Sequence, residues 1–207
     1  MKIAIIGAGI AGLTVAKKLK DFSDITIFEK SRGAGGRVCS RYAEPYVFDH
    51  GAQFFIARTK KFNRFLEPMI ETGVIVPWNA KFVEIKKGKI TSTRQWDNNH
   101  PHYVGLPTMS EIGRYLSRDL NLYLNTEVQI KKKKDQWQIV DKEGGDRGLF
   151  DWVISTAPSS QSASMLPRDY KFHKTLIDRK MVGCFSLMLG FNDSLDTVSY
   201  THLTLPT

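Results

Sequence analysis

The first alternation of hydrophobic and polar positions along the chain predicts a βαβ unit. Residues 2–6 are an apolar, β-branched run that predicts a buried strand, and the spacing of apolar residues over 13–20 predicts an amphipathic helix. A second strand is expected at residues 24–28. A strand, a turn, a helix and a second strand in this order favour a parallel sheet with helical crossovers.

The middle of the chain changes to short strands. We expect paired strands at 38–42 and 46–49, a turn and short strand at 50–55, and a helix over 59–72 that Pro68 kinks or ends. Thr108 is expected to cap a helix with Glu111 in its first turn. Further strands are predicted at residues 74–76, 81–86, 89–94, 128–130, 137–140, 150–154 and 181–189, with a hairpin turn at Lys87–Gly88.

These elements predict an α/β fold, in which a Rossmann-type sheet is interrupted by a β-rich insertion. The expected ranges are 1–72 for the first part of the nucleotide-binding domain, 73–107 for the β-rich substrate segment, 108–165 for the return to the first domain, 166–197 for the start of a second substrate segment and 198–207 for a non-native tail. Residues 198–207 match a translated transposase sequencing adapter, and a genuine terminal strand is the alternative.

Composition narrows the class of protein. The chain has 207 residues, 42% hydrophobic and 25% charged, which is ordinary for a soluble globular protein. No apolar run is long enough for a membrane span, and no signal peptide is expected before residue 2. Cys39 and Cys184 are far apart without metal-ligand spacing, which favours a reduced cytoplasm and two buried free thiols.

The net charge of +9 raises the question of nucleic-acid binding. The one dense block, Lys131–Lys134, lies between two strand-like runs and precedes Asp135. A solvated hairpin end is the favoured interpretation, so no nucleic-acid partner and no membrane partner is expected.

The turn after the first strand carries the chemistry of a dinucleotide site. Gly7 permits a tight turn, Gly9 lets the backbone approach phosphate, and Gly12 lets the helix pack close to the strand. Glu29 ends the second strand, where a carboxylate accepts hydrogen bonds from ribose hydroxyls and repels a 2′-phosphate. The helix N-terminus would then face the pyrophosphate.

A second glycine-rich loop over residues 31–37 follows the ribose acid. A nicotinamide dehydrogenase has no need of it, whereas a longer flavin dinucleotide must pass such a loop closely. Gly36 permits that approach, and the Arg37 guanidinium can neutralise phosphate oxygens. The alternative for Arg37 is a solvated side chain in a flexible loop.

These motifs resemble the FAD-dependent amine-oxidase superfamily, and within it the renalase-like proteins. The segments that carry the resemblance are 7–12, 35–37, 49–54, 126–128 and 151–158. The resemblance implies non-covalently bound FAD, with Gln53 and Phe54 by the isoalloxazine, Val128 contacting adenine through its backbone and Ala157 beside the cofactor. The full expected cofactor set is Gly7, Ala8, Gly9, Ala11, Gly12, Glu29, Lys30, Gly36, Arg37, Gln53, Phe54, Val128 and Ala157.

The resemblance also implies a reaction. Renalase-like enzymes oxidise isomeric dihydro-NAD(P) by hydride transfer to flavin N5, with O2 as acceptor and H2O2 as product. The flavin supplies that chemistry, so no catalytic acid–base pair is nominated, and His50 is taken as a structural histidine. Alternatives are an amine, porphyrinogen or carotenoid oxidoreductase of the same superfamily, or a non-catalytic nucleotide-binding module. The family is longer than this chain, which is therefore expected to be inactive alone.

Overall fold

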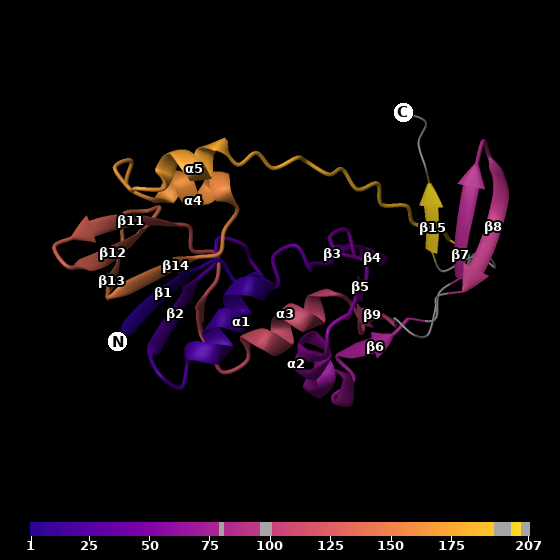
Figure 1. Ribbon diagram of the computed structural model, residues 1–207, viewed down its shortest axis with the longest axis horizontal. Coiled ribbons are helices and arrows are strands. Elements are labelled where there is room, and N and C mark those ends of the chain that lie inside the picture. Colours follow the sequence, from indigo (N-terminus) through magenta and orange to yellow (C-terminus); the bar gives the residue numbers. More distant parts are fainter. Residues whose placement is uncertain (79–80, 96–100, 193–199, 204–207) are drawn as a thin grey trace. The chain divides into compact units, whose positions relative to one another are not determined.

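The computed structural model describes residues 1–78, 81–95, 101–192 and 200–203 (Figure 1). The chain divides into two compact units. Unit 1 comprises Met1–Cys39 and Ser110–Ser186, and unit 2 comprises Ser40–Met109 and Leu187–Thr207. The finer domain ranges expected from the sequence remain a prediction.

Unit 1 is built on a four-stranded parallel sheet in the order β10-β2-β1-β14. Its strands are β1 (Lys2–Ile6), β2 (Asp24–Phe28), β10 (Asn121–Tyr123) and β14 (Trp152–Ser155). Helix α1 (Ile10–Leu19) connects β1 to β2, and α3 (Ser110–Ser117) precedes β10. The chain therefore adds strands on one side of β1 and then crosses to the other side, which confirms the expected α/β class with a Rossmann-type sheet.

Both faces of this sheet are covered, which explains why its strands read as continuous apolar runs. Four of the five residues of β1 are buried. Ala4, Ile6 and Phe28 pack on one face in a core shared with the strands β11 to β13. The alternate residues Ile3 and Ile5 point to the opposite face, because successive side chains of a strand alternate. Helix α1 packs on the sheet and on α3.

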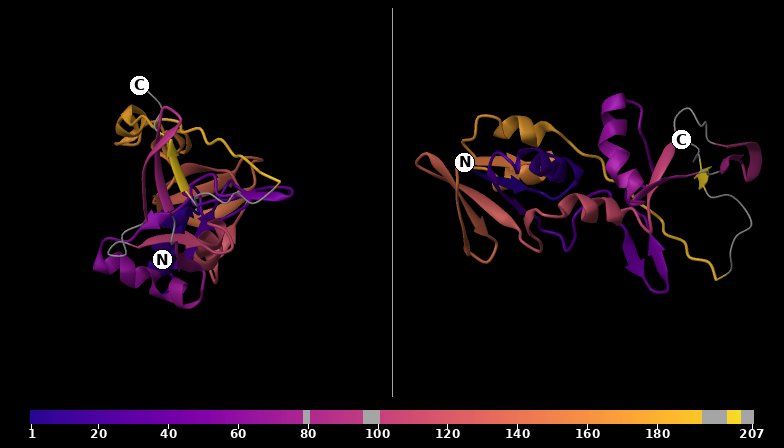
Figure 2. Two further views of the ribbon diagram at one scale, coloured as in Figure 1. Left: turned by 90° about the vertical axis from the view of Figure 1, so that its right-hand side faces the viewer. Right: turned by 90° about the horizontal axis from the view of Figure 1, so that it is seen from below.

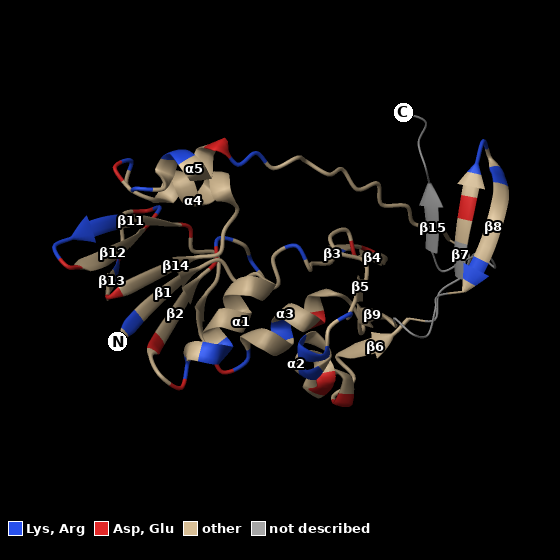
Figure 3. Ribbon diagram, in the orientation of Figure 1, with Lys and Arg blue, Asp and Glu red and all other residues tan. Residues whose placement is uncertain are grey.

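The antiparallel sheet β11-β12-β13 covers the first face (Figure 1). Its strands are β11 (Val128–Lys133), β12 (Gln136–Asp141) and β13 (Asp146–Phe150). The hairpin predicted across the lysine block is confirmed. Lys131 to Lys134 are all exposed, and Figure 3 shows the positive charge gathered along β11 and its turn.

The single strand predicted at 150–154 is wrong, because the chain changes sheets inside it. Phe150 pairs with Trp137 of β12, whereas Trp152 pairs with Ile3 of β1. Asp151 lies at the change and its carboxylate accepts a hydrogen bond from the Lys2 N–H at 2.8 Å. A hydrophobic run alone does not show which sheet each residue joins.

Further differences from the sequence prediction lie in residues 121–123 and 159–189. Strand β10 was not predicted, since its three residues give no periodicity. Helices α4 (Ser159–Met165) and α5 (His173–Asp178) were not predicted either. The strand predicted at 181–189 is absent, because this segment has no strand partner among the described residues. Cys184 lies in it and is exposed, which corrects the expected buried thiol, while Cys39 is half-buried.

The described residues of unit 2 form short sheets and one helix. Strand β9 (His102–Gly105) pairs with β5 (Phe55–Ile56) and β6 (Ile75–Pro77), and β3 (Arg41–Ala43) pairs with β4 (Tyr46–Phe48). Strands β7 (Lys81–Lys86) and β8 (Lys89–Gln95) form the expected hairpin. Lys87 and Gly88 both have positive φ angles, of 50° and 73°, as that two-residue turn requires.

Helix α2 (Lys60–Glu71) begins after Thr59, whose hydroxyl accepts a hydrogen bond from the Phe62 N–H. Pro68 does not end α2, which continues for three more residues. The Thr72 N–H donates to the Pro68 carbonyl at 3.2 Å, so the turn after the proline still closes.

The predicted capping role of Thr108 is wrong. Its hydroxyl oxygen is buried without a hydrogen-bond partner in the described structure. The Met109 N–H, immediately before α3, instead donates to Asp49 Oδ1 at 3.1 Å. Ser40 Oγ donates to the same carboxylate. The acceptor comes from a residue 60 positions away, so a local capping pattern could not predict it.

Strand β15 (Tyr200–Leu203) pairs in parallel with β7, and Figure 1 shows their arrows running in the same direction. The left-hand view of Figure 2 shows the yellow strand beside the β7–β8 hairpin. The rest of the segment interpreted as an adapter lies outside the described residues, so that interpretation remains a prediction. Within the described residues, no helix has the length and apolar character to cross a membrane.

Candidate dinucleotide-binding site

The site forms where the strand order of the parallel sheet reverses. Strands β1 and β14 are neighbours, and their carboxyl ends lead into Gly7 and Thr156 respectively. In sheets of this kind a ligand binds in the crevice outside the carboxyl ends at this switch point. Strand β2 ends beside β1, which brings Glu29 to the same edge.

The first glycine turn is shaped by its own packing at two positions. Gly7 has a φ of +101°, and its N–H donates to the Phe28 carbonyl at 2.8 Å, so the turn starts as a continuation of the sheet. A Cβ on Gly12 would overlap the Gly7 carbonyl oxygen. These two glycines are therefore required by the fold, as the sequence predicts.

Gly9 differs, because the chain itself does not require a glycine there. Its φ and ψ of −71° and 173° suit any residue. A Cβ built on Gly9 would meet only the Gly36 Cα, at 4.0 Å, which is ordinary contact. The surface next to Gly9, at the N-terminus of α1, is thus a cradle that one methyl group would fill. A group outside the chain that approaches the backbone closely explains the glycine.

The second glycine loop packs directly on the first turn. The Gly35 N–H donates to the Ala8 carbonyl at 2.8 Å, and Gly9 forms an isolated bridge with Gly35. Gly36 has a φ of +61°, and a Cβ there would lie 3.0 Å from the Gly9 Cα. The structure therefore brings together the two loops that the sequence predicted to act on one ligand.

Glu29 braces both loops. Its side chain is buried, with 8% exposure. One carboxylate oxygen accepts the Ala8 N–H at 2.7 Å and the other accepts the Ser31 N–H at 2.8 Å. Each carboxylate oxygen can accept more than one hydrogen bond, so capacity for ribose hydroxyls remains. Both polar backbone groups of Ala8 are used within the chain, so Ala8 shapes the site rather than offering an amide to a ligand.

The remaining predicted residues of unit 1 differ in exposure. Ala11, in the first turn of α1, is exposed, as are Lys30 and the guanidinium-bearing Arg37. Ala157 is half-buried and follows Thr156 at the end of β14. The exposed basic side chains of Lys30, just before the second loop, and Arg37, at its end, together with the N-terminus of α1, give an edge suited to an anion.

Val128 presents its backbone to an open strand edge. The Lys142 N–H donates to the Glu127 carbonyl, and the Asp141 N–H donates to Gly145 instead of β11. Val128 and Asp141 therefore form a non-hydrogen-bonded pair, and the Val128 N–H and C=O point away from β12. Strand β11 is an edge strand, so these groups are oriented for the backbone contact that the sequence predicted.

Gln53 and Phe54 lie in unit 2. Gln53 is exposed. The Phe54 ring contacts Trp78 and His102, with centroids 5.7 and 5.1 Å apart, so Phe54 belongs to an aromatic cluster of that unit. The expectation that both lie by a flavin ring remains a prediction.

Sequence reasoning missed Thr156. Its hydroxyl lies 3.1 Å from the Ile6 carbonyl oxygen and 3.0 Å from the Gly7 carbonyl oxygen. It therefore touches the first glycine turn from β14, across 149 positions of sequence. The only available signal was its place at the end of a predicted buried strand.

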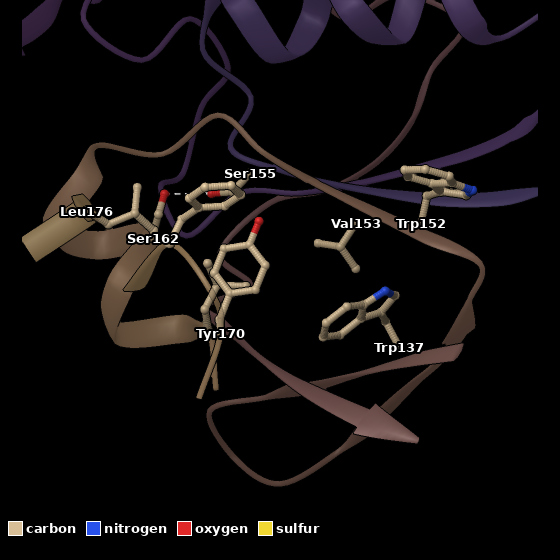
Figure 4. Close-up of a pocket in the computed structure, with 9 residues that line it drawn as sticks. Trp137, Trp152, Val153, Ser155, Ser162, Tyr170 and Leu176 are labelled. Carbon is tan, nitrogen blue, oxygen red and sulfur yellow. Dashed lines mark hydrogen bonds between the residues drawn. The ribbon is translucent and has the colours of Figure 1, made fainter. Parts of the chain in front are cut away.

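Unit 1 also contains a cavity of about 450 Å³ between β12, β14 and the helices α4 and α5 (Figure 4). Its lining is Trp137, Trp152, Val153, Ser155, Ser162, Leu166, Tyr170, Phe172 and Leu176. None of these nine residues is charged, so the cavity does not suit a pyrophosphate. Ser155 and Ser162 share a hydrogen bond of 2.7 Å in its wall.

Comparison with known proteins agrees with this geometry. Residues 5–68 match the family described as NAD(P)-binding Rossmann-like domain. A 52-residue stretch is 42% identical to 4,4′-diapophytoene desaturases of Staphylococcus aureus strains, covering 25% of this chain and 10% of the desaturase. The chain thus spans a tenth of the length of these curated relatives.

Solved structures show a similar fold at low identity. A protein assigned as a protoporphyrinogen oxidase from Exiguobacterium sp. superposes with a TM-score of 0.61 at 12% identity, over 80% of this chain and 61% of the other. A CLA-producing fatty acid isomerase from P. acnes gives 0.62 at 14% identity, over 83% and 63%. The family match thus lies within residues 5–68, and the solved structures share the fold of this chain.

Proposed function

We propose that the chain forms the FAD-binding part of an oxidoreductase. The observation that carries the proposal is the cradle at Gly9, a backbone surface with room for a ligand between two interlocked glycine loops. A binding site for nicotinamide dinucleotide needs the first turn only. The second loop, built against the first by the Gly35–Ala8 hydrogen bond, supports a cofactor that passes both.

Different residues would contact each part of the cofactor. The N-terminal amides of α1 around Ala11 would face the pyrophosphate, and the Arg37 guanidinium would pair with its oxygens. Glu29 would accept hydrogen bonds from the ribose hydroxyls. The outward backbone groups of Val128 would contact the adenine edge. Ala157 would flank the cofactor from the end of β14.

The reaction we propose is oxidation of an isomeric dihydro-NAD(P), as in renalase-like proteins. FAD, when bound, would take up the hydride equivalent and pass its electrons to O2, giving H2O2. The family resemblance supports Gln53 and Phe54, both in unit 2, as residues that would lie by the isoalloxazine. A carotenoid or porphyrinogen substrate is the second candidate, because one relative is a desaturase and one similar structure is assigned as a protoporphyrinogen oxidase.

The cofactor is tested by titrating the 207-residue chain into FAD while following flavin fluorescence anisotropy. We expect saturable binding that ADP reverses, and weaker competition by NADP than by NAD because Glu29 would repel a 2′-phosphate. The cofactor assignment would be overturned if the flavin anisotropy did not change when the chain is added. It would also be overturned if added salt reversed the change in anisotropy as readily as ADP does.

The substrate is tested in a separate experiment, on a full-length protein that contains this chain as its FAD-binding part. Under anaerobic conditions, an isomeric dihydronicotinamide dinucleotide should bleach the flavin absorbance within the mixing time of the assay or shortly after. A flavin that is bleached instead by a porphyrinogen, and not by the dihydronicotinamide, would support the second candidate and reject the first.

A further inference from the structure

The end of β14 makes an unusual contact with the first glycine turn. Thr156 donates through its backbone N–H to the Ile6 carbonyl at 2.9 Å. Its hydroxyl lies within hydrogen-bond distance of two successive carbonyls, those of Ile6 and Gly7. One hydroxyl proton shared between two acceptors fixes both peptide planes at the point where β1 becomes the turn.

The same hydroxyl sets how closely α1 approaches. A Cβ on Gly7 would lie 2.9 Å from Thr156 Oγ1, and a Cβ on Gly12 would lie 2.8 Å from it. The oxygen thus fills the space that the side chains of both glycines would otherwise occupy. Thr156 is in contact with the first and the third glycine of the turn, while Gly9 remains open between them.

We infer that Thr156 is a positioning residue for the dinucleotide, through its hydroxyl contacts with the Ile6 and Gly7 carbonyls. The inference rests on the proposed dinucleotide site and adds a residue to it. Glu29 holds the turn at Ala8 from the β2 side, and Thr156 holds it at Gly7 from the β14 side. Between these two anchors the backbone at Gly9 is kept in the orientation that a pyrophosphate requires.

The prediction is specific to the phosphate part of the ligand. Thr156→Val keeps the shape of the side chain and removes the hydroxyl, whereas Thr156→Ser keeps the hydroxyl. We expect the valine variant to bind ADP on the order of 5-fold to 10-fold more weakly, the size expected for one lost hydrogen bond, with adenosine binding changed less than about 2-fold. The serine variant should bind ADP within about 2-fold of the unmodified chain.

Thr14→Val is the matched control. Thr14 Oγ1 also donates to a backbone carbonyl, that of Ile10, but this hydrogen bond is local to α1 and does not link the turn to β14. It should leave the affinities for ADP and adenosine unchanged. Equal losses for ADP and adenosine in Thr156→Val, or an ADP affinity equal to that of the unmodified chain, would overturn the positioning role.

A ligand-independent measurement separates this inference from the proposed function. Amide hydrogen exchange at residues 8–12 should be faster in Thr156→Val than in the unmodified chain and restored in Thr156→Ser. If exchange responds in this way while the unmodified chain binds neither ADP nor FAD, the anchoring of the turn stands and the dinucleotide site falls. If the chain binds ADP and exchange is unaffected by the valine, Thr156 has no positioning role.

Discussion

Among the three glycines of the first turn, Gly9 is the one whose identity the folded chain does not explain. Gly7 and Gly12 are required by the backbone itself, through a positive φ in one case and a steric overlap in the other. At Gly9 the backbone is extended and a methyl group fits. This contrast distinguishes residues that build the site from the residue that leaves room for the ligand.

The first prediction follows from that contrast. Gly9→Ala should leave the free energy of unfolding within about 0.5 kcal/mol of the unmodified chain, because the new methyl meets no close neighbour. Its affinity for FAD should fall on the order of 10-fold or more, a loss that corresponds to about 1.4 kcal/mol. Denaturant unfolding and flavin anisotropy measure the two quantities on the same sample.

Gly33→Ala is the matched control, since Gly33 is exposed in the second loop and a Cβ there would meet nothing within 4 Å. It should change neither quantity. If Gly9→Ala bound FAD as tightly as the unmodified chain, the cradle would have no role in phosphate binding.

Glu29 gives the second prediction at the scale of single residues. In the unmodified chain, each carboxylate oxygen of Glu29 accepts a hydrogen bond from a backbone N–H. In Glu29→Gln, the side-chain amide nitrogen would replace one of these oxygens and would face a backbone N–H, so two donors would meet. We expect a loss of about 1–3 kcal/mol in the free energy of unfolding, the cost of a buried donor without an acceptor. Urea denaturation monitored by circular dichroism tests this. Unchanged stability would show that the carboxylate does not brace the two loops.

At the scale of elements, predictability depended on how much sequence each element occupies. The opening βαβ unit was predictable because apolar periodicity, turn glycines and the terminal acid agree over residues 2–29. Strand β10, with three residues, gives no such signal, although it completes the sheet. The change of sheet at Asp151 is invisible in the sequence, since Phe150 and Trp152 are both apolar but pair with different strands.

The β12–β13 turn provides a prediction about pH. The Gly145 N–H donates to Asp141 Oδ1, and this hydrogen bond, helped by Arg147, holds the pKa of Asp141 below its ordinary value of 3.8. A lowered pKa in the folded state stabilises the fold above the unfolded-state pKa. That contribution is lost as the pH falls through the lower, folded-state pKa.

Asp141→Asn should therefore lose less stability than the unmodified chain when the pH falls from about 5 to about 2. Asp151, whose pKa is also lowered, mainly by the Gln136 side-chain amide, titrates in the same range and is retained in the variant. Part of the acid sensitivity should accordingly persist. Parallel acid profiles for the two proteins would count against the Asp141 hydrogen bonds as its source.

At the scale of the whole molecule, unit 1 brings the two glycine loops and Glu29 together at one edge of the parallel sheet, while Val128 lies on β11 of the antiparallel sheet. That these residues bind a cofactor stays a prediction. The contact between Thr156 and the turn could not be predicted, because it depends on β1 and β14 being neighbours across 149 positions. Gln53 and Phe54 belong to unit 2, so their relation to the cofactor rests on the resemblance alone.

The central claim is that backbone amides at the start of α1 hold the pyrophosphate of FAD. Backbone amide chemical shifts, recorded by NMR during titration of the isotopically labelled chain with FAD, test it most directly. The account predicts saturable shifts at Gly9, Ala11, Gly12 and Gly36, reproduced by ADP. The account would be contradicted if the only shifts came from residues that line the cavity between β12, β14, α4 and α5. It would also be contradicted if a large excess of FAD produced no shifts.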